Sequence, residues 1–222
     1  MSLQLYHVMT DILAMPYYKN QHHQSGNVDF GHEQSVGQVL LKNGFIQQQM
    51  RVKKSILKEW AETSNDSLIS QALPNFKPGQ FISQPSGSQD FPDFLVCDYN
   101  AKFYALECKS GKSSCPTWND NIPKPNAIYI FSSMKYNQTT IFLGKDVISD
   151  IERNLFVLQV AAYKKINDQY KKKLSTQDIH VRGWVLNARP KFSQYGGNKK
   201  TDYFSHSDRQ LCETNVLNVV KL

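Results

Sequence analysis

Two apolar segments separated by four residues constrain the fold of this chain more than any other feature. Residues 91–97 (FPDFLVC) and 102–109 (KFYALECK) each have the length of a β-strand, and the DYNA between them contains Asp and Asn, which favour tight turns. The pattern predicts a β-hairpin. Asp93, Glu107 and Lys109 lie within these apolar segments, and ionised side chains in a strand need a partner or a function.

Helical patterns lie on both sides of the hairpin. Apolar residues recur at helical spacing in three segments: 31–45, 53–63 and 148–174. In the first of these, Asn43-Gly44 supplies a C-terminal stop. The last is the clearest helix, because Ile151, Leu155 and Leu158 recur at three- and four-residue intervals and its lysines gather in the final turns.

Further strands are predicted by short apolar runs. They lie at 127–133, 139–144, 179–188 and 214–222, the last of which reads TNVLNVVKL. Residues 74–90 are rich in Pro, Gly, Ser and Gln and predict an ordered loop. Helices before and after a central group of strands indicate a mixed α/β fold with a central mixed β-sheet flanked by helices.

The composition limits the class of protein. The chain has 222 residues, 40% hydrophobic and 20% charged, so we expect one globular domain over 1–222. It has no long apolar run and no signal-peptide pattern, so we expect a cytoplasmic protein without a membrane span. The four cysteines form no C-x-x-C pair and are expected to be reduced thiols rather than zinc ligands. The net charge of +7 favours a polyanionic partner.

The charged residues of the hairpin suit metal-assisted chemistry. Successive strand residues point to opposite faces, so Glu107 and Lys109 share a face, and Asp93 can approach Glu107 from the adjoining strand. Two close carboxylates repel each other, and a divalent cation relieves this repulsion. Mg²⁺ prefers oxygen ligands, can acidify a bound water and can stabilise charge on a phosphoryl oxygen. With Lys109 to orient the attacking water or neutralise the phosphorane, the set suits phosphodiester hydrolysis.

The alternative is a surface hairpin in which Glu107 and Lys109 form an exposed charge pair. Glu107 is the only one of the 19 acidic residues that is followed two places later by lysine. It also ends an apolar strand, and a Pro-Asp opens the neighbouring one. The combination is therefore more specific than an acid-x-Lys triplet by itself.

Pro92-Asp93 followed by Glu107-Cys108-Lys109 resembles the signature of the PD-(D/E)xK nuclease superfamily. The segment GHEQSVGQVLLKNGF (31–45) resembles the helix that precedes the core of these enzymes. QPSGSQDFPDF (84–94) and ALECKSGKSS (105–114) are most similar to type II restriction endonucleases. The resemblance covers about residues 31–145 and implies a restriction-endonuclease-like catalytic core there, with a C-terminal part over 146–222 that adds a helix and DNA-recognition elements.

The resemblance also implies roles for individual residues. Asp93 and Glu107 are expected to bind Mg²⁺, for which Mn²⁺ can substitute, with the Cys108 carbonyl as a third ligand and Lys109 as the catalytic lysine. Glu33 matches a glutamate that assists metal binding in the family, although a glutamate near a helix start is also favoured by the helix dipole alone.

DNA contact is expected from residues before the Pro-Asp and from two polar loops, 109–126 and 187–210, which suit phosphates and base edges. The candidates are Ser88, Gln89, Lys112, Ser113, Ser114, Thr117, Trp118, Asn119, Arg189, Lys191, Gln194, Asn198, Lys199, Lys200 and Arg209. The alternatives are a structural loop anchored by Trp118 and a solvated basic hairpin. The two histidines of QHHQSG (21–26) lack the context of an HNH nuclease and predict a polar loop.

These observations lead to one main interpretation and two alternatives. The main one is a Mg²⁺-dependent type II restriction endonuclease from a bacterial or archaeal cytoplasm that cuts double-stranded DNA and leaves 5′-phosphate ends. Cleavage of a two-fold symmetric site favours a homodimer, paired in function with a DNA methyltransferase of the same specificity. The alternatives are a repair, recombination or structure-selective nuclease with the same core, and a non-catalytic DNA-binding protein on a degenerate nuclease fold.

Overall fold

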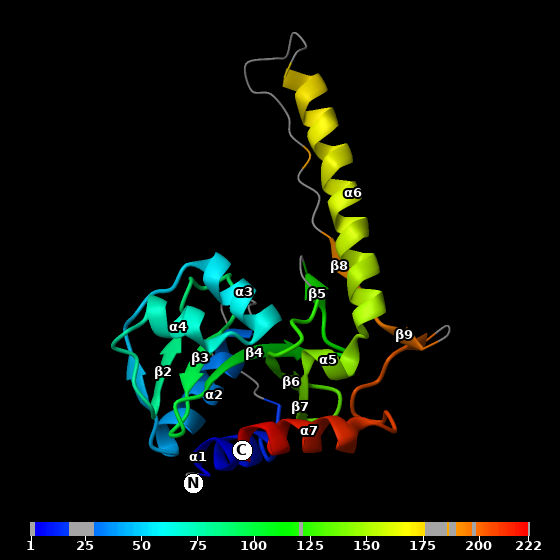
Figure 1. Cartoon of the computed structure of the whole chain (residues 1–222). Coiled ribbons are helices and arrows are strands. Elements are labelled where there is room, and N and C mark those ends of the chain that lie inside the picture. Colours follow the sequence, from blue (N-terminus) through cyan, green and yellow to red (C-terminus); the bar gives the residue numbers. More distant parts are fainter. Residues whose placement is uncertain are drawn as a thin grey trace.

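The computed structural model describes residues 3–17, 29–119, 122–175, 186, 190–196 and 199–221, and its centre is a six-stranded mixed β-sheet (Figure 1). The strand order is β1-β2-β3-β4-β6-β7. The strands are β1 Ile46–Gln48, β2 Gln80–Ser83, β3 Phe94–Cys97, β4 Phe103–Gly111, β6 Ile128–Ser133 and β7 Gln138–Leu143. The β1/β2 and β4/β6 pairs are parallel and the other three are antiparallel, so the predicted mixed α/β class is confirmed.

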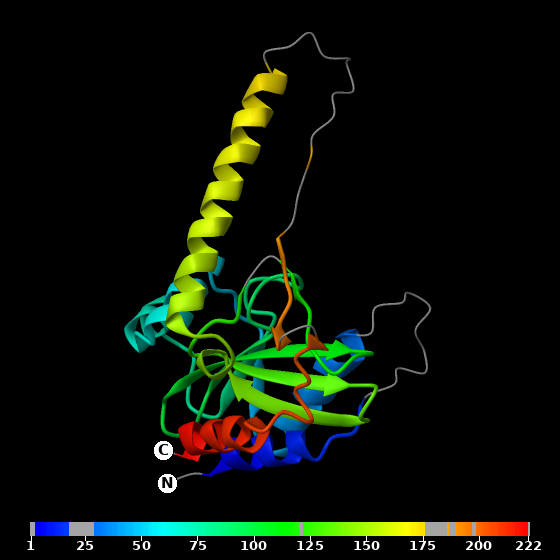
Figure 2. The same ribbon diagram turned by 90° about the vertical axis from the view of Figure 1, so that its right-hand side faces the viewer.

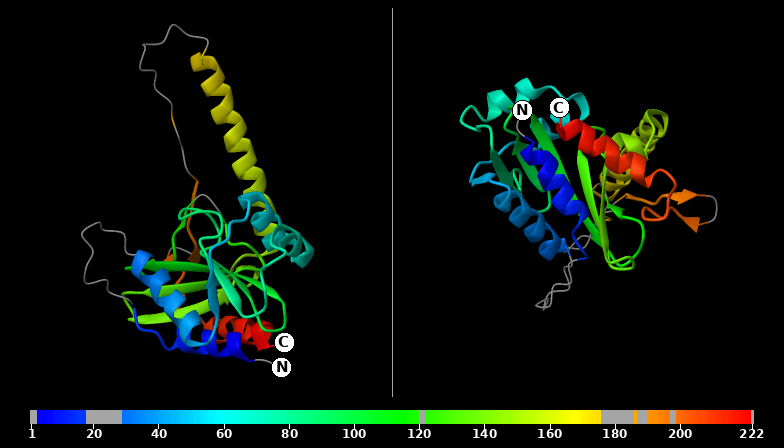
Figure 3. Two further views of the ribbon diagram at one scale, coloured as in Figure 1. Left: turned by 90° about the vertical axis from the view of Figure 1, so that its left-hand side faces the viewer. Right: turned by 90° about the horizontal axis from the view of Figure 1, so that it is seen from below.

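Helices cover both faces of the sheet. Helices α1 (Gln4–Leu13), α2 (Asp29–Lys42) and α7 (Arg209–Lys221) lie against one face, where Figure 3 shows α1 and α7 side by side. Helices α3 (Lys54–Thr63) and α4 (Asp66–Ala72) bury Leu57, Trp60 and Ile69 against the other face. None of the helices in the described part of the chain is long and apolar enough to cross a membrane.

The remaining elements lie after the sheet. They are β5 (Trp118–Asn119), which pairs with β8 (Lys191–Phe192), the short helix α5 (Gly144–Val147), the long helix α6 (Asp150–Ser175), and β9 (Tyr195–Gly196), which pairs with β10 (Lys199–Lys200). Helix α6 projects from the body of the protein (Figures 1 and 2).

The predicted hairpin, the three predicted helices and the strands at 127–133 and 139–144 are confirmed, within a few residues at their ends. The four cysteines are free thiols, as expected, and three of them are buried. The strand predicted at 179–188 and the loop at 21–26 lie outside the described residues, apart from residue 186.

The predicted C-terminal strand is wrong, because residues 209–221 form helix α7. Its β-branched residues favour a strand by propensity, but Val216 and Val220 are four positions apart and both are buried between β7 and α1. Tertiary packing at helical spacing therefore overrides the local preference. The loop predicted at 74–90 also needs correction, since it contains β2, whose Phe81 and Ile82 are buried on opposite faces of the sheet.

Gly144 makes a testable contribution to the fold. It starts α5, and a Cβ there would overlap the Lys124 carbonyl oxygen, so only glycine permits this approach of the chain to residues 124–127. We expect Gly144→Ala to lower the free energy of unfolding by about 3 kcal/mol or more, because the clash is with backbone that cannot move aside. Chemical denaturation measures the change. Gly37→Ala is the control: its Cβ would meet only the Phe94 ring at 3.6 Å, and alanine favours the helix. Equal effects of the two substitutions would contradict the prediction.

Candidate active site

The candidate site lies where β4 loses its β3 neighbour. Strand β4 pairs with β3 only through residues 103–106 and with β6 through residues 106–111. The Phe94–Leu106 pairing is the last of the β3/β4 register, so Asp93 and Glu107 come next to each other just beyond it. From Glu107 onward, β4 therefore has an open side.

Beyond the end of β3, the Asp93 side chain provides the hydrogen-bond acceptor that a neighbouring strand would otherwise provide for β4. Its Oδ2 accepts a hydrogen bond of 2.6 Å from the Cys108 N–H, which points to the side on which β3 has ended. Because the N–H and C=O of one strand residue point toward the same neighbour, the Cys108 carbonyl also faces this side. The Asp93 carboxylate and the Cys108 carbonyl therefore lie on the same side of β4.

Glu107 and Lys109 lie on the same face of β4 and contact each other. Lys109 Nζ donates to Glu107 Oε1 at 2.7 Å, and the two side chains are only 27% and 13% exposed. The alternative interpretation required an exposed pair on a surface hairpin, and this geometry does not fit it. Within the described residues, the second carboxylate oxygen, Glu107 Oε2, is buried and has no hydrogen-bond partner.

Negative charge is concentrated around Asp93. Burial raises the pKa of this carboxyl well above its ordinary value of 3.8, and the nearby Glu107 and Glu33 carboxylates raise it further. Lys109 and the hydrogen bond from the Cys108 N–H lower the pKa of Asp93, but the pKa stays above its ordinary value. A site with this excess of acceptors and a buried oxygen without a donor is suited to a cation.

The donor set fits Mg²⁺ rather than a metal held by protein side chains alone. Among the residues that the structure describes, no group of three or more His, Cys, Asp and Glu side chains is arranged to hold a metal. Two carboxylates and a backbone carbonyl are hard oxygen ligands, and Mg²⁺ commonly completes such a set with waters and substrate phosphate. Glu33 lines the same cavity, where its Oε2 accepts a 3.2 Å hydrogen bond from Gln84.

These side chains open into a cavity of about 390 Å³. Its lining includes Ser88, Gln89, Trp118 and Asn119, four of the residues predicted to contact DNA, together with the charged cluster. The other lining residues are Asp90, Phe91, Cys108, Ile122, Lys124 and Tyr129.

Lys124 and Tyr129 were not predicted as site residues. The parallel register places Tyr129 directly beside Glu107, and its hydroxyl oxygen accepts a 2.7 Å hydrogen bond from the Lys124 N–H. Lys124 also pairs with Glu62 at 2.5 Å. The sequence offered one signal for Lys124, its position in the 109–126 loop that begins at Lys109, but the β4–β6 pairing that places Tyr129 beside Glu107 is not visible in the sequence.

Part of the predicted DNA-contact set lies away from this cavity. Lys112, Ser113 and Thr117 are exposed, and the Ser113 and Ser114 carbonyls accept hydrogen bonds from the Ser133 hydroxyl and the Tyr203 N–H. Lys191, Lys200 and Arg209 lie on the C-terminal segment, and Arg209 pairs with Glu213 at 2.8 Å. Arg189, Asn198 and the side chain of Lys199 lie outside the described residues.

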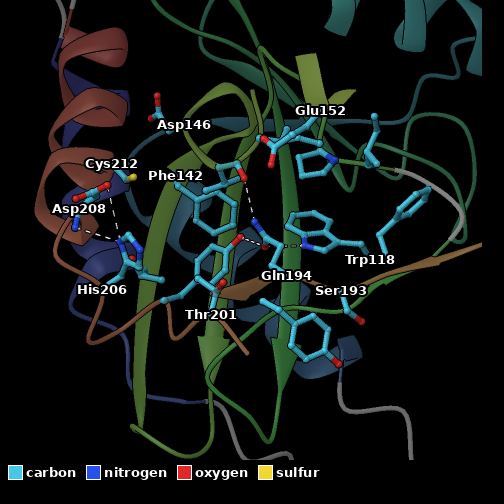
Figure 4. Close-up of a pocket in the computed structure, with 18 of the residues that line it drawn as sticks. Trp118, Phe142, Asp146, Glu152, Ser193, Gln194, Thr201, His206, Asp208 and Cys212 are labelled. Carbon is cyan, nitrogen blue, oxygen red and sulfur yellow. Dashed lines mark hydrogen bonds and ion pairs between the residues drawn. The ribbon is translucent and has the colours of Figure 1, made fainter. Parts of the chain in front are cut away.

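Gln194 belongs to a second cavity (Figure 4), which also measures about 390 Å³ and shares Trp118 with the first. Its amide oxygen accepts hydrogen bonds from Trp118 Nε1 and the Tyr203 hydroxyl, and its amide nitrogen donates to the Val147 carbonyl at 2.9 Å. The side chain therefore fixes Trp118 between the two cavities, as the structural alternative for the 109–126 loop expected.

Comparison of the chain with family models, curated proteins and solved structures finds no match. The assignment of function therefore rests on the residues and their geometry.

Proposed function

We propose that this chain is a Mg²⁺-dependent nuclease that hydrolyses phosphodiester bonds of double-stranded DNA. The observation that carries the proposal is the convergence of Asp93, Glu107 and Lys109 at the open side of β4, inside a cavity and with Glu107 Oε2 left without a hydrogen-bond partner among the described residues. A structural ion pair would not need a buried acceptor without a donor, because such an atom destabilises the fold.

Asp93, Glu107 and the Cys108 carbonyl are the residues that would hold Mg²⁺, with Glu33 assisting from α2. When bound, the metal would supply an acidified water and stabilisation of charge on a phosphoryl oxygen. Lys109 is held in place by Glu107, so its ammonium group presents a fixed positive charge that can orient a water or stabilise negative charge developing at phosphorus.

The surroundings of the cluster suit a polyanionic substrate. Ser88, Gln89 and Asn119 line the same cavity and offer hydrogen-bond donors for phosphate oxygens or base edges. Lys124 adds a second cation there, and the net charge of the chain is +7. Within this proposal we favour a type II restriction endonuclease that acts as a homodimer, leaves 5′-phosphate ends and is paired with a methyltransferase of the same specificity.

Digestion of a plasmid of known sequence tests the proposal. We expect purified protein to produce discrete fragments with Mg²⁺ or Mn²⁺ and intact plasmid with EDTA, because the clustered carboxylates need a cation to accept a phosphate. Sequencing of the fragment ends then gives the recognition sequence and the stagger. Cutting that is equally fast in EDTA, or intact plasmid with every divalent metal, would refute the proposed activity.

The same digest separates the two alternatives. Cleavage confined to ends, flaps or junctions indicates a repair, recombination or structure-selective nuclease with this core. Retention of DNA without metal-dependent cleavage indicates a binding protein on a degenerate nuclease fold, although the complete Asp93, Glu107 and Lys109 set favours catalysis.

A further inference from the structure

Helix α6 exposes a continuous apolar stripe. Ile151, Leu155, Leu158 and Ile166 are 75%, 61%, 67% and 54% exposed, and the exposed Ala162 lies between the last two. At 3.6 residues per turn these five positions fall on one side of the helix. Large contiguous apolar patches are rare on the surface of globular proteins, and where they occur they mark an interaction surface.

The body of the protein holds α6 by a different side. Arg153 is buried and donates to the Pro123 carbonyl, and the Phe156 ring lies 5.2 Å from the Phe192 ring of β8. Figures 1 and 2 show the helix projecting from the body of the protein, and the stripe residues Ile151, Leu155 and Leu158 are exposed. The stripe is therefore not needed to attach the helix to its own chain.

We propose that the α6 stripe, defined as Ile151, Leu155, Leu158, Ala162 and Ile166, binds the same stripe of a second copy of this chain, with the two helices antiparallel. A two-fold axis near Leu158 then places Ile151 of each copy beside Ile166 of the other, because an isologous interface pairs each patch with itself. This inference specifies the contact of the homodimer that the proposed function includes, but it does not require nuclease activity.

The charges of α6 favour the antiparallel orientation. Asp150 and Glu152 lie in the first turn, whereas Lys171, Lys172 and Lys173 lie near the end. With the axis near Leu158, an antiparallel pair places Glu152 of each copy at the level of Lys165 of the other and opposes the two helix dipoles, whereas a parallel pair places like charges together.

The size of the contact also requires more of α6 than the stripe alone. A standard stable interface buries about 800 Å² on each partner, more than four aliphatic side chains supply. With the axis near Leu158, residues 150–167 of the two helices overlap over about 27 Å, so the contact also includes the polar residues that flank the stripe. We therefore expect a dimer of moderate affinity whose strength falls with added salt.

Sedimentation of the full chain at increasing concentration tests the interface. We expect a dimer at on the order of 10 µM protein, and at least about 100-fold weaker association for Leu155→Lys, because the substitution enters the symmetric contact twice. Val157→Lys is the matched control: Val157 is 56% exposed on the same helix but lies outside the stripe, so association should be unchanged. Circular dichroism confirms that each variant is folded.

Disulfide cross-linking tests the orientation, in a Cys212→Ser background that removes the only half-buried thiol among the native cysteines. A mixture of Ile151→Cys and Ile166→Cys chains should cross-link, and either chain alone should not, because the two positions are about 22 Å apart along the helix. Cross-linking of each chain alone would overturn the antiparallel arrangement. A wild-type chain that stays monomeric, or one whose stripe instead binds anionic vesicles, would overturn the dimer.

Discussion

Lys109→Met is expected to reduce DNA cleavage by at least about 1,000-fold, which is the scale for losing one charged group that stabilises a transition state. Methionine keeps the length and apolar stem of the side chain but removes the ammonium group that contacts Glu107 at 2.7 Å. DNA binding measured by fluorescence anisotropy in EDTA should change by less than about tenfold, because one of several cations is lost. The loss therefore belongs to the chemical step rather than to binding.

Lys102→Met provides the matched control for this substitution. Lys102 directly precedes β4, is exposed and lies at the opposite end of the strand from the cavity. Its cleavage rate should stay within about threefold of the wild-type rate, as expected for a surface position. If Lys109→Met retained more than a tenth of the wild-type rate, Lys109 would have to be assigned a structural role.

The part of the site that the sequence predicts is local. Alternation of side chains along a strand puts Glu107 and Lys109 on one face, and a four-residue connection forces Asp93 to return beside them. These relations involve fewer than twenty residues of chain. Local rules were therefore sufficient for the hairpin and its three charged residues.

The parts that sequence reasoning missed depend on distant contacts. Tyr129 reaches Glu107 only through the parallel β4–β6 register, and Val216 and Val220 form a helix because β7 and α1 cover them. The pattern of α6 gave its helical conformation correctly, yet the same pattern could not tell whether its apolar face packs inside the chain or remains exposed. Hydrophobic periodicity indicates which side needs a partner but not which partner it has.

Asp93→Asn is expected to abolish cleavage and, at the same time, to stabilise the metal-free protein. The amide keeps an oxygen that can accept the Cys108 N–H bond, but it removes a buried negative charge that lies beside Glu107 and Glu33. Because the folded-state pKa of Asp93 is raised above 3.8, its ionisation favours the unfolded chain once the pH exceeds that value. We expect the variant to melt at least about 4 °C higher than the wild type at pH 7 in EDTA, with the difference vanishing below about pH 4. Mg²⁺ should raise the melting temperature of the wild type and so reduce its difference from that of the Asp93→Asn variant.

Asp202→Asn is the same chemical change at a different carboxylate, and it should change the stability of the protein in the opposite direction. Burial alone would raise the pKa of Asp202, but hydrogen bonds from Tyr136, the backbone N–H groups of Phe204 and Ser205, and Lys135 together lower it to about 2. This carboxylate stabilises the fold above pH 3.8, and the contribution is lost as the pH falls through about 2, so its replacement should destabilise the protein at pH 7 by about 1 kcal/mol. A destabilised Asp93→Asn protein would mean that the fold, rather than a bound cation, compensates the charge at Asp93, and the case for a metal site would fail. If Asp93→Asn stabilises the protein and Asp202→Asn destabilises it, the Asp93 carboxylate lowers the stability of the metal-free protein. This result is expected of a carboxylate that serves as a metal ligand.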